Sequence, residues 1–397
     1  MYPVTQAALP SPIPTLTTLP NYIPQELNGE SGTNREDEHL NQLRAKNDYD
    51  AVQCWLKEYE HKETTYKSYQ KEAERFLLWC VYQHQKPLSS LDKEDFKAYF
   101  DFLSNPQPST FWCGRPGGNH GHRGTSNWKP FVGPLGSTSK QTAVTIIHSL
   151  MQYFVQARYL KFNPIMLMRS YRKVRPTIEE RSLQVRVRIL TAEEWMAMLT
   201  TLGNLPETPS SAQFEKYRLR FIIEILCLLG LRVGELTTHT WNAFREEEGA
   251  WWFFVLGKGD KPGKIPVNEE LLSAIKRYRL FMGLSPLPNP EDTIPIITPW
   301  HGKKPISSSH INKALKRLAI QTADIYFANQ PYKHEKLKGF SAHWLRHLSA
   351  SMQDQAGISF TIIQANMRHK SGETTRQYIH AMDRKRHEEM NKIKLKV

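Results

Sequence analysis

A basic stretch without apolar periodicity, residues 169–188, divides the chain into two parts that each carry helical patterning. It reads RSYRKVRPTIEERSLQVRVR, with seven Arg or Lys against two Glu and an internal proline, Pro176. This composition is typical of an extended linker and not of a core element. The chain of 397 residues is therefore expected to form two domains joined by a basic linker, since each part is long enough to bury a core.

The excess of basic residues is not confined to the linker. Lys and Arg number 53 against 39 Asp and Glu, giving a net charge of +14. This balance favours a polyanionic partner, nucleic acid before membrane. No apolar run is long enough to span a bilayer, so no membrane association is expected. The four cysteines lack CxxC spacing, which fits a reducing cytoplasm better than a disulfide framework.

The first part of the chain divides into an arm and a helical domain. Residues 1–45 are rich in Pro, Thr, Asn and Gly without a sustained period, which predicts a flexible N-terminal arm or a tail draped over the protein. Residues 46–168 contain four stretches with apolar residues every three to four positions, which predicts a small four-helix domain. Between the third and fourth stretches lies an insertion, residues 105–138, that is long for a structureless loop and is expected to be functional.

The insertion allows two interpretations. Cys113, His120 and His122 raise the alternative of a zinc site, but the usual ligand spacings are missing. We therefore expect no metal or other cofactor, and favour a loop that touches a phosphate backbone. An ordinary solvated segment is the alternative for the basic linker. The residues predicted to contact nucleic acid are Lys67, Lys71 and Lys140 on the helices, Arg115, Arg123 and Lys129 with Trp128 in the insertion, and Arg172, Lys173 and Arg175 in the linker.

The second part of the chain, from residue 190, predicts a mostly helical domain with one small sheet. AQFEKYRLRFIIEILCLLG reads as a buried helix that ends at Gly230. AWWFFVLGKGDKPGKIPV reads as two strands around a glycine-rich turn. Four further helical stretches follow, and Asn or Ser caps open the first three. The predicted fold class is mainly α with a small antiparallel β-sheet.

Several cationic side chains stand where these elements would hold them firmly. Arg232 closely follows the glycine that ends the buried helix, although a surface pairing with Glu235 is an alternative reading. Lys258 stands between two glycines at the hairpin tip. It can reach into a groove there, although a lysine in a turn is more often simply solvated.

A histidine, a further arginine and a tyrosine complete a group suited to phosphate chemistry. His343 and Arg346 are three residues apart in SAHWLRHLSASM, hence on one helix face. Fixed cations and a proton donor are what a five-coordinate phosphate transition state requires. No carboxylates occur in a recognisable metal-binding spacing, which indicates a side-chain nucleophile. Tyr378 in HKSGETTRQYIH can supply it.

On these motifs, the chain resembles the tyrosine recombinases, also called phage integrases, over residues 190–385 and more loosely over the helical domain before them. MRH stands where the family usually has LGH, so Met367 and Arg368 replace its leucine and glycine. The resemblance implies that the catalytic residues are Arg232 in GLRVGEL, Lys258 in GKGDKPGKIPV, His343 and Arg346 in HWLRH, His369 in MRH and Tyr378 in TTRQYIH, with Glu235 and His347 beside them.

The resemblance also implies a domain organisation. Residues 46–168 would form a helical, SAM-like core-binding domain for DNA, and residues 189–385 a mixed α/β catalytic domain. The basic linker, residues 169–188, would join them. Residues 386–397 would form a C-terminal tail that docks on a neighbouring protomer, with docking on its own domain or fraying as the alternative.

The implied activity is site-specific DNA recombination for a mobile genetic element. Such an enzyme, an integrase, cuts and rejoins DNA through a 3′-phosphotyrosine intermediate and a Holliday junction, without metal or ATP. The implied partners are double-stranded DNA with specific recombination sites and three further copies of the chain in a homotetramer on paired sites. The expected location is the bacterial cytoplasm, at the nucleoid. The alternatives are a type IB topoisomerase-like DNA-relaxing enzyme and a non-catalytic DNA-binding regulator on the same scaffold.

Overall fold

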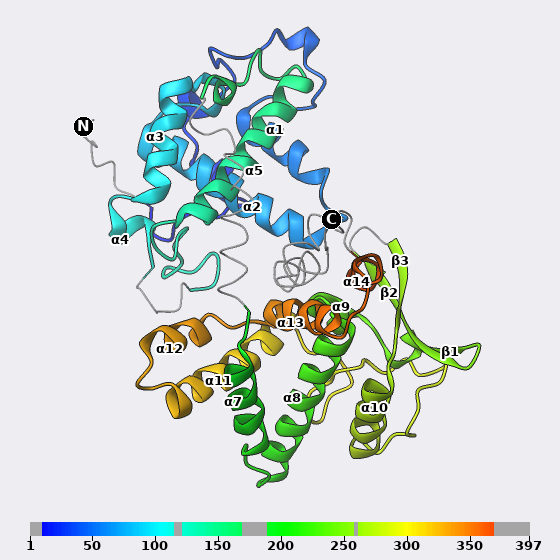
Figure 1. The fold of residues 1–397 in the computed structure, drawn as a ribbon. Helices are drawn as coiled ribbons and strands as arrows, with labels where there is room; N and C mark the ends of the chain where they lie inside the picture. The colour runs from blue at the N-terminus through cyan, green and yellow to red at the C-terminus, as the bar shows by residue number, and fades with distance from the viewer. Residues whose placement is uncertain (1–9, 115–120, 169–188, 258–260, 369–397) are drawn as a thin grey trace, which may run out of the picture. The chain divides into compact units, whose positions relative to one another are not determined.

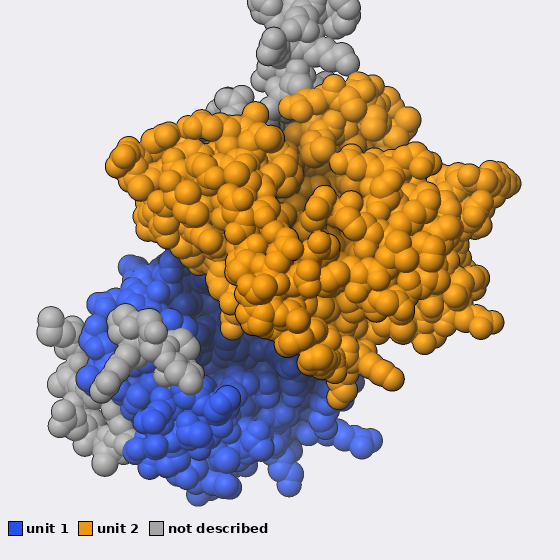
Figure 2. All heavy atoms as spheres, turned by 90° about the horizontal axis from the view of Figure 1, so that it is seen from below, with its two compact units in different colours: residues 1–175 blue, residues 176–397 orange. Residues whose placement is uncertain are grey.

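The computed structural model describes residues 10–114, 121–168, 189–257 and 261–368. The chain divides into two compact units, unit 1 (Met1–Arg175) and unit 2 (Pro176–Val397), coloured separately in Figure 2. The fold is mainly helical, with one three-stranded antiparallel sheet (Figure 1), as the sequence predicts. Within the described residues, no helix has the length and apolarity needed to cross a membrane.

Unit 1 contains the four helices that the apolar period predicts. Helix α5 packs against α1, α2 and α3, and a π-helix, η4, continues α2 at its C-terminal end. The helices of unit 1 are α1 (Asp48–Lys57), α2 (Glu63–Leu78), η4 (Trp79–His84), α3 (Lys93–Ser104), α4 (Ser109–Trp112) and α5 (Ser137–Gln156). The 3-10 helices are η1 (Leu19–Tyr22), η2 (Gln25–Leu27), η3 (Glu38–Leu40), η5 (Leu88–Ser90) and η6 (Pro164–Leu167).

The N-terminal segment differs from the flexible arm expected over residues 1–45. In its described part, residues 10–45, Leu16 and Leu19 are buried in the core of unit 1. The Leu16 amide also donates a hydrogen bond of 2.7 Å to the buried carboxylate of Glu74 on α2. The apolar residues of this segment are too sparse to form a helical period, but each fills a gap in a core that other elements build.

The insertion is also less open than expected. Phe111, Trp112 and Phe131 are buried in the core of unit 1, and Trp128 is only 7 % exposed. The Phe131 amide donates to the Trp112 carbonyl at 3.0 Å, which ties the two ends of the segment together. The expected phosphate contact by Trp128 is therefore not supported, because its indole packs in the protein interior.

Unit 2 is built around helix α8, which packs against α10 and α13 (Figure 1). The sheet has the order β1-β2-β3, and its central strand places Phe253 opposite both Phe244 and Ile265 on the buried face. The helices of unit 2 are α7 (Ala192–Gly203), α8 (Ser210–Leu229), α9 (Val233–Thr238), η8 (Trp241–Ala243), α10 (Glu269–Phe281), α11 (Ser308–Tyr326), α12 (Pro331–Lys338), α13 (Ala342–Gln355) and α14 (Phe360–Met367). The strands are β1 (Phe244–Glu247), β2 (Ala250–Gly257) and β3 (Lys261–Pro266).

The buried helix α8 ends at Gly230, as the sequence predicts. Gly230 has φ +58°, the left-handed conformation that favours glycine at a helix end. A Cβ at this position would lie 2.4 Å from the Cε atom of Met367 at the end of α14. The glycine therefore ends one helix and allows another to approach it closely.

Leu19→Ala should lower the free energy of unfolding of unit 1 by about 2–5 kcal/mol, because it leaves a cavity in the core. Leu167→Ala, at a leucine that is 61 % exposed, is the matched control and should change it by less than about 0.5 kcal/mol. Urea-dependent hydrogen exchange of peptides from residues 48–104 in the full chain measures both values. Equal effects of the two changes would mean that residues 10–45 are not part of the core.

Candidate active site

Helix α9 begins at Val233, directly after its N-cap residue Arg232, and carries Glu235 in its first turn. The Glu235 carboxylate accepts from the Arg232 amide at 2.8 Å and from the Arg232 guanidinium at 3.0 Å. The first bond caps the helix, and the second fixes the direction of the arginine side chain. The Arg232 side chain remains 43 % exposed, whereas that of Glu235 is 7 % exposed. The guanidinium is thus oriented by a buried carboxylate while it stays open to a ligand.

The backbone of Glu235 connects α9 to the hairpin through His239. The Leu256 amide donates to His239 Nε2 at 3.1 Å, so this nitrogen holds the lone pair. His239 Nδ1 then carries the proton and donates to the Glu235 carbonyl oxygen at 2.6 Å. Leu256 stands two residues before Lys258 in the sequence. Sequence reasoning missed His239, because nothing in its neighbouring residues indicates these distant partners.

Arg368 brings the end of α14 to the same carboxylate. Its Nη2 atom donates to Glu235 Oε2 at 2.6 Å, and its side chain is 13 % exposed. Burial lowers the pKa of the Arg368 guanidinium, which the Glu235 carboxylate opposes. The sequence marks Arg368 as a departure from the family pattern but gives it no role. The structure makes it a partner of Glu235.

Arg346 on α13 joins the ends of two other helices. Its guanidinium is buried and donates to the carbonyl oxygens of Gly230, at the end of α8, and Met367, at the end of α14. Carbonyl dipoles at helix C-termini attract a cation. Gly230 lies two residues before Arg232 in the sequence. Arg346 therefore binds the short segment that carries Arg232, the other predicted catalytic arginine.

His343 and His347 occupy neighbouring turns of α13. Their rings lie edge to face with centroids 4.5 Å apart, and His343 is exposed whereas His347 is buried. Ser341 precedes the helix, as predicted, but its side chain makes no capping bond within the described residues. Asn312 of α11 instead accepts from the Ala342 amide at 3.0 Å. The helix that carries His343 is therefore capped by a residue distant in sequence.

The remaining predicted site residues lie outside the described residues. They are Lys258, His369 and Tyr378 of the catalytic set, Arg115 of the insertion, Arg172, Lys173 and Arg175 of the linker, and the tail over residues 386–397.

Three of the predicted DNA contacts gather along helix α2 in unit 1. Lys67 and Lys71 are one helical turn apart, and Arg123 reaches the same helix from the insertion. The Arg123 guanidinium donates to Gln70 at 3.2 Å and to Glu74 at 2.6 Å. Burial raises the pKa of Glu74, and Arg123 opposes this shift. These residues form a strip of basic side chains along α2, each paired with a carboxylate of that helix: Glu63, Glu72 and Glu74.

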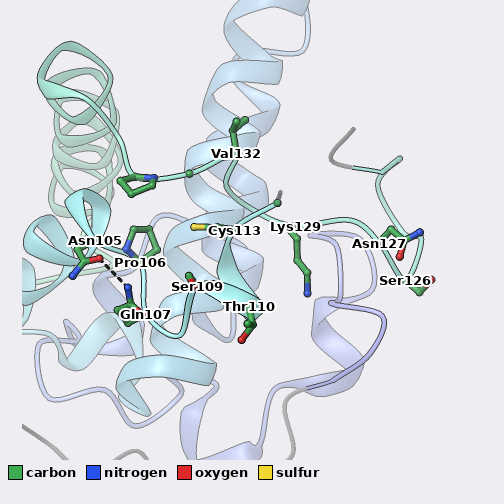
Figure 3. Close-up of a pocket in the computed structure, with 13 residues that line it drawn as sticks. Asn105, Pro106, Gln107, Ser109, Thr110, Cys113, Ser126, Asn127, Lys129 and Val132 are labelled. Atoms are coloured by element: carbon green, nitrogen blue, oxygen red, sulfur yellow. Dashed lines mark hydrogen bonds between the residues drawn. The ribbon is translucent and has the colours of Figure 1, made fainter. Parts of the chain in front are cut away.

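Lys129 lines a separate hollow in unit 1, and Lys140 stands at the start of α5. The hollow has a volume of about 990 Å³ and is walled by the insertion, with Cys113 and Lys129 facing it (Figure 3). Lys129 is the one charged side chain among the described residues that line it. The Lys129 ammonium lies 5.8 Å from the centre of the Phe111 ring. Lys140 Nζ lies 3.7 Å from Asp101 Oδ1. Neither lysine belongs to the strip along α2.

In the part of the chain that the structure describes, no three His, Cys, Asp or Glu side chains gather as a metal site. Cys113 and His122 of the insertion therefore belong to no such group among the described residues. His120 lies outside the described residues.

Arg346→Lys should lower the free energy of unfolding of unit 2 by about 1–3 kcal/mol, because a buried carbonyl loses its donor. Arg317→Lys on the exposed face of α11 is the control and should be neutral within about 0.5 kcal/mol. Urea-dependent hydrogen exchange of peptides from α8 and α13, measured without DNA, reports both. If Arg346 served only to bind a ligand, the two changes would have equal effects.

Comparisons with known proteins place this chain in a family. Residues 188–385 match the model of the phage integrase family. Tyrosine recombinase XerC from Caldanaerobacter subterraneus subsp. tengcongensis is 29 % identical over 310 residues, which cover 77 % of this chain and 69 % of that protein. Tyrosine recombinase XerD from Staphylococcus saprophyticus is 26 % identical over 248 residues, covering 62 % of this chain and 73 % of that protein.

Solved structures agree in fold. The XerH site-specific recombinase in its pre-cleavage complex with difH has a TM-score of 0.56 at 16 % identity, covering 91 % of each chain. The Tn1549 transposon integrase in complex with transposon right end DNA has a TM-score of 0.55 at 16 % identity, covering 86 % of this chain and 99 % of the other. The family match and the recombinase relatives together give the conclusion that this chain belongs to the phage integrase family, the tyrosine recombinases.

Proposed function

We propose that this chain is a site-specific DNA recombinase that cuts and rejoins double-stranded DNA. The observation that carries the proposal is the common anchoring of two arginines. Arg346 binds the carbonyl of Gly230, two residues before Arg232. Guanidinium groups held in place before the reaction stabilise charge on the non-bridging oxygens of a phosphate without later reorganisation.

Cleavage is a transesterification at a DNA phosphate. The Tyr378 hydroxyl oxygen bonds to phosphorus, and the bond from phosphorus to the 5′ oxygen breaks. Lys258 gives a proton to that leaving oxygen, and His343 receives the proton of the tyrosine. His369 donates a hydrogen bond to the phosphate. The products are a 3′-phosphotyrosine and a free 5′-hydroxyl, so the energy of the broken ester bond is kept in the new one.

Rejoining reverses these steps with a different strand. The 5′-hydroxyl of a partner duplex attacks the phosphotyrosine and releases the tyrosine, which gives a Holliday junction. The number of phosphodiester bonds is unchanged, so ATP is not needed. Exchange between two duplexes requires four active sites, hence a homotetramer on paired sites, in which residues 386–397 would dock on a neighbouring protomer. The DNA of the bacterial cytoplasm is the proposed setting.

Unit 1 supplies a surface for the DNA backbone. Lys67, Lys71 and Arg123 line one face of α2, which suits contacts to successive phosphates that hold a duplex without reading its sequence. The Arg123 guanidinium donates to Gln70 and Glu74. The glutamate therefore sets the direction of the arginine side chain.

Tyr378→Phe should abolish covalent attachment to DNA and leave binding unchanged within about twofold, because only the nucleophilic oxygen is lost. The target is first selected from a pool of random duplexes by binding to the wild-type protein. A nicked duplex with the selected site then traps the covalent complex, which denaturing gels separate from free protein. The matched control is Tyr332→Phe on α12, at a tyrosine that is 70 % exposed, and it should form the complex at the wild-type yield.

Two outcomes would contradict the proposal. A covalent complex formed by Tyr378→Phe at the wild-type yield would move the nucleophile elsewhere, and no complex with the wild-type protein would favour a non-catalytic regulator. Relaxation of a supercoiled plasmid that lacks the selected site distinguishes a type IB topoisomerase. The recombinase should leave that plasmid supercoiled.

A further inference from the structure

Arg368 adopts a backbone conformation that its side chain does not favour. Its φ is +52°, in the left-handed region, where residues with a Cβ are uncommon. Glycine, which has no Cβ, would adopt this conformation without such a restriction. A strained residue persists only where its surroundings hold it, and such residues gather at functional sites. The side chain of Arg368 therefore calls for a specific explanation.

The Arg368 side chain lies between three elements, α9, α14 and β3. Nη2 donates to Glu235 Oε2 on α9 at 2.6 Å, and Nη1 donates to the Asn366 carbonyl at the end of α14 at 3.1 Å. Its Cδ atom would lie 3.3 Å from a Cβ at Gly263 on β3. The side chain is 13 % exposed. Arg368 is therefore built into the site and is not a solvated surface arginine.

Sharing Glu235 changes the charge of the site. A pair of Arg232 and Glu235 alone has no net charge, whereas Arg232, Glu235 and Arg368 together carry one positive charge. Glu235 Oε2 accepts from both the Arg232 amide and Arg368, while Oε1 accepts from the Arg232 guanidinium. The positive charge of Arg368 offsets that of the carboxylate, so the electrostatic potential around Arg232 is more positive than it would be beside an unshared Glu235. Arg232 can then keep its fixed direction and still attract a phosphate.

We propose that Arg368 is a positioning residue for strand cleavage: it holds Glu235 against Arg232 and keeps this cluster positively charged toward the scissile phosphate. The role rests on the proposed recombinase function. Arg368 also anchors the end of α14, from which the chain continues directly to His369. Its effect should thus fall on the rate of cleavage and not on the affinity for DNA, which many other basic residues share.

Arg368→Gln should slow single-turnover formation of the covalent complex by about tenfold or more and change Kd for the same nicked duplex by less than about twofold. Arg368→Lys, which keeps the charge, should recover more than half of the lost rate on a logarithmic scale. Arg368→Gly should cleave as slowly as Arg368→Gln but have a higher Tm than Arg368→Gln, because glycine suits the left-handed backbone. A cleavage rate that does not follow Tm across these variants separates positioning from a structural role.

A second arginine pair on unit 2 provides a matched control. Glu224 accepts from Arg220 at 3.0 Å and from Arg277 at 2.6 Å, so it too is a carboxylate shared by two arginines. Arg220→Gln makes the same charge change at this other carboxylate and should leave the cleavage rate within about twofold of wild type.

The dependence on Glu235 has its own test. In a Glu235→Gln background, Arg368→Gln should slow cleavage by less than a further factor of about two, since the residue acts through the carboxylate. The proposed role is overturned if the Arg368 variants cleave at the wild-type rate, if Arg220→Gln slows cleavage equally, or if the effects of Glu235→Gln and Arg368→Gln multiply independently. If the wild-type protein forms no covalent complex, the recombinase function itself fails, and the role of Arg368 fails with it.

Discussion

The buried Glu235 is the interaction on which the candidate active site depends. Its carboxylate caps helix α9, orients the exposed guanidinium of Arg232 and binds Arg368 at the end of α14. Its backbone carbonyl binds His239, which in turn accepts from Leu256 in strand β2. One residue thus joins three segments that are far apart in the sequence. Two of these segments lead directly to stretches that carry proposed catalytic residues.

Arg346 supports the same arrangement through other contacts. Its guanidinium donates to the carbonyls of Gly230 and Met367 and so holds the ends of α8 and α14 together. A buried cation satisfied by carbonyl dipoles is stable only while both carbonyls remain in place. The guanidinium therefore acts both as a structural link and, in the proposed reaction, as a phosphate ligand. Glu235 and Arg346 together account for how a small α-helical scaffold can keep cationic groups close to one another despite their repulsion.

Local patterns in the sequence predicted much of the fold. Apolar periodicity predicted the main helices of unit 1 and α8, α10, α11, α13 and α14 of unit 2, and turn chemistry predicted the β2-β3 hairpin and the helix end at Gly230. These local patterns could not predict long-range contacts. Leu16 is buried by residues far along the chain, and His239 finds partners in two different elements. Arg368 was visible as an unusual residue, but its partner Glu235 lies 133 positions away. A sequence period reports which face of an element is apolar and does not report what that face meets.

In the proposed reaction, Tyr378 joins DNA through a 3′-phosphate while Arg232 and Arg346 bind the oxygens of that phosphate. Mass spectrometry of the trapped covalent complex tests it most directly. Trypsin cleaves after Arg376 and Arg384, so Tyr378 is the single tyrosine of the peptide formed by residues 377–384. We expect a nuclease-trimmed nucleotide attached to this tyrosine through its 3′-phosphate, and a free 5′-hydroxyl on the released strand. A nucleotide attached to any other residue, or through a 5′-phosphate, would contradict it.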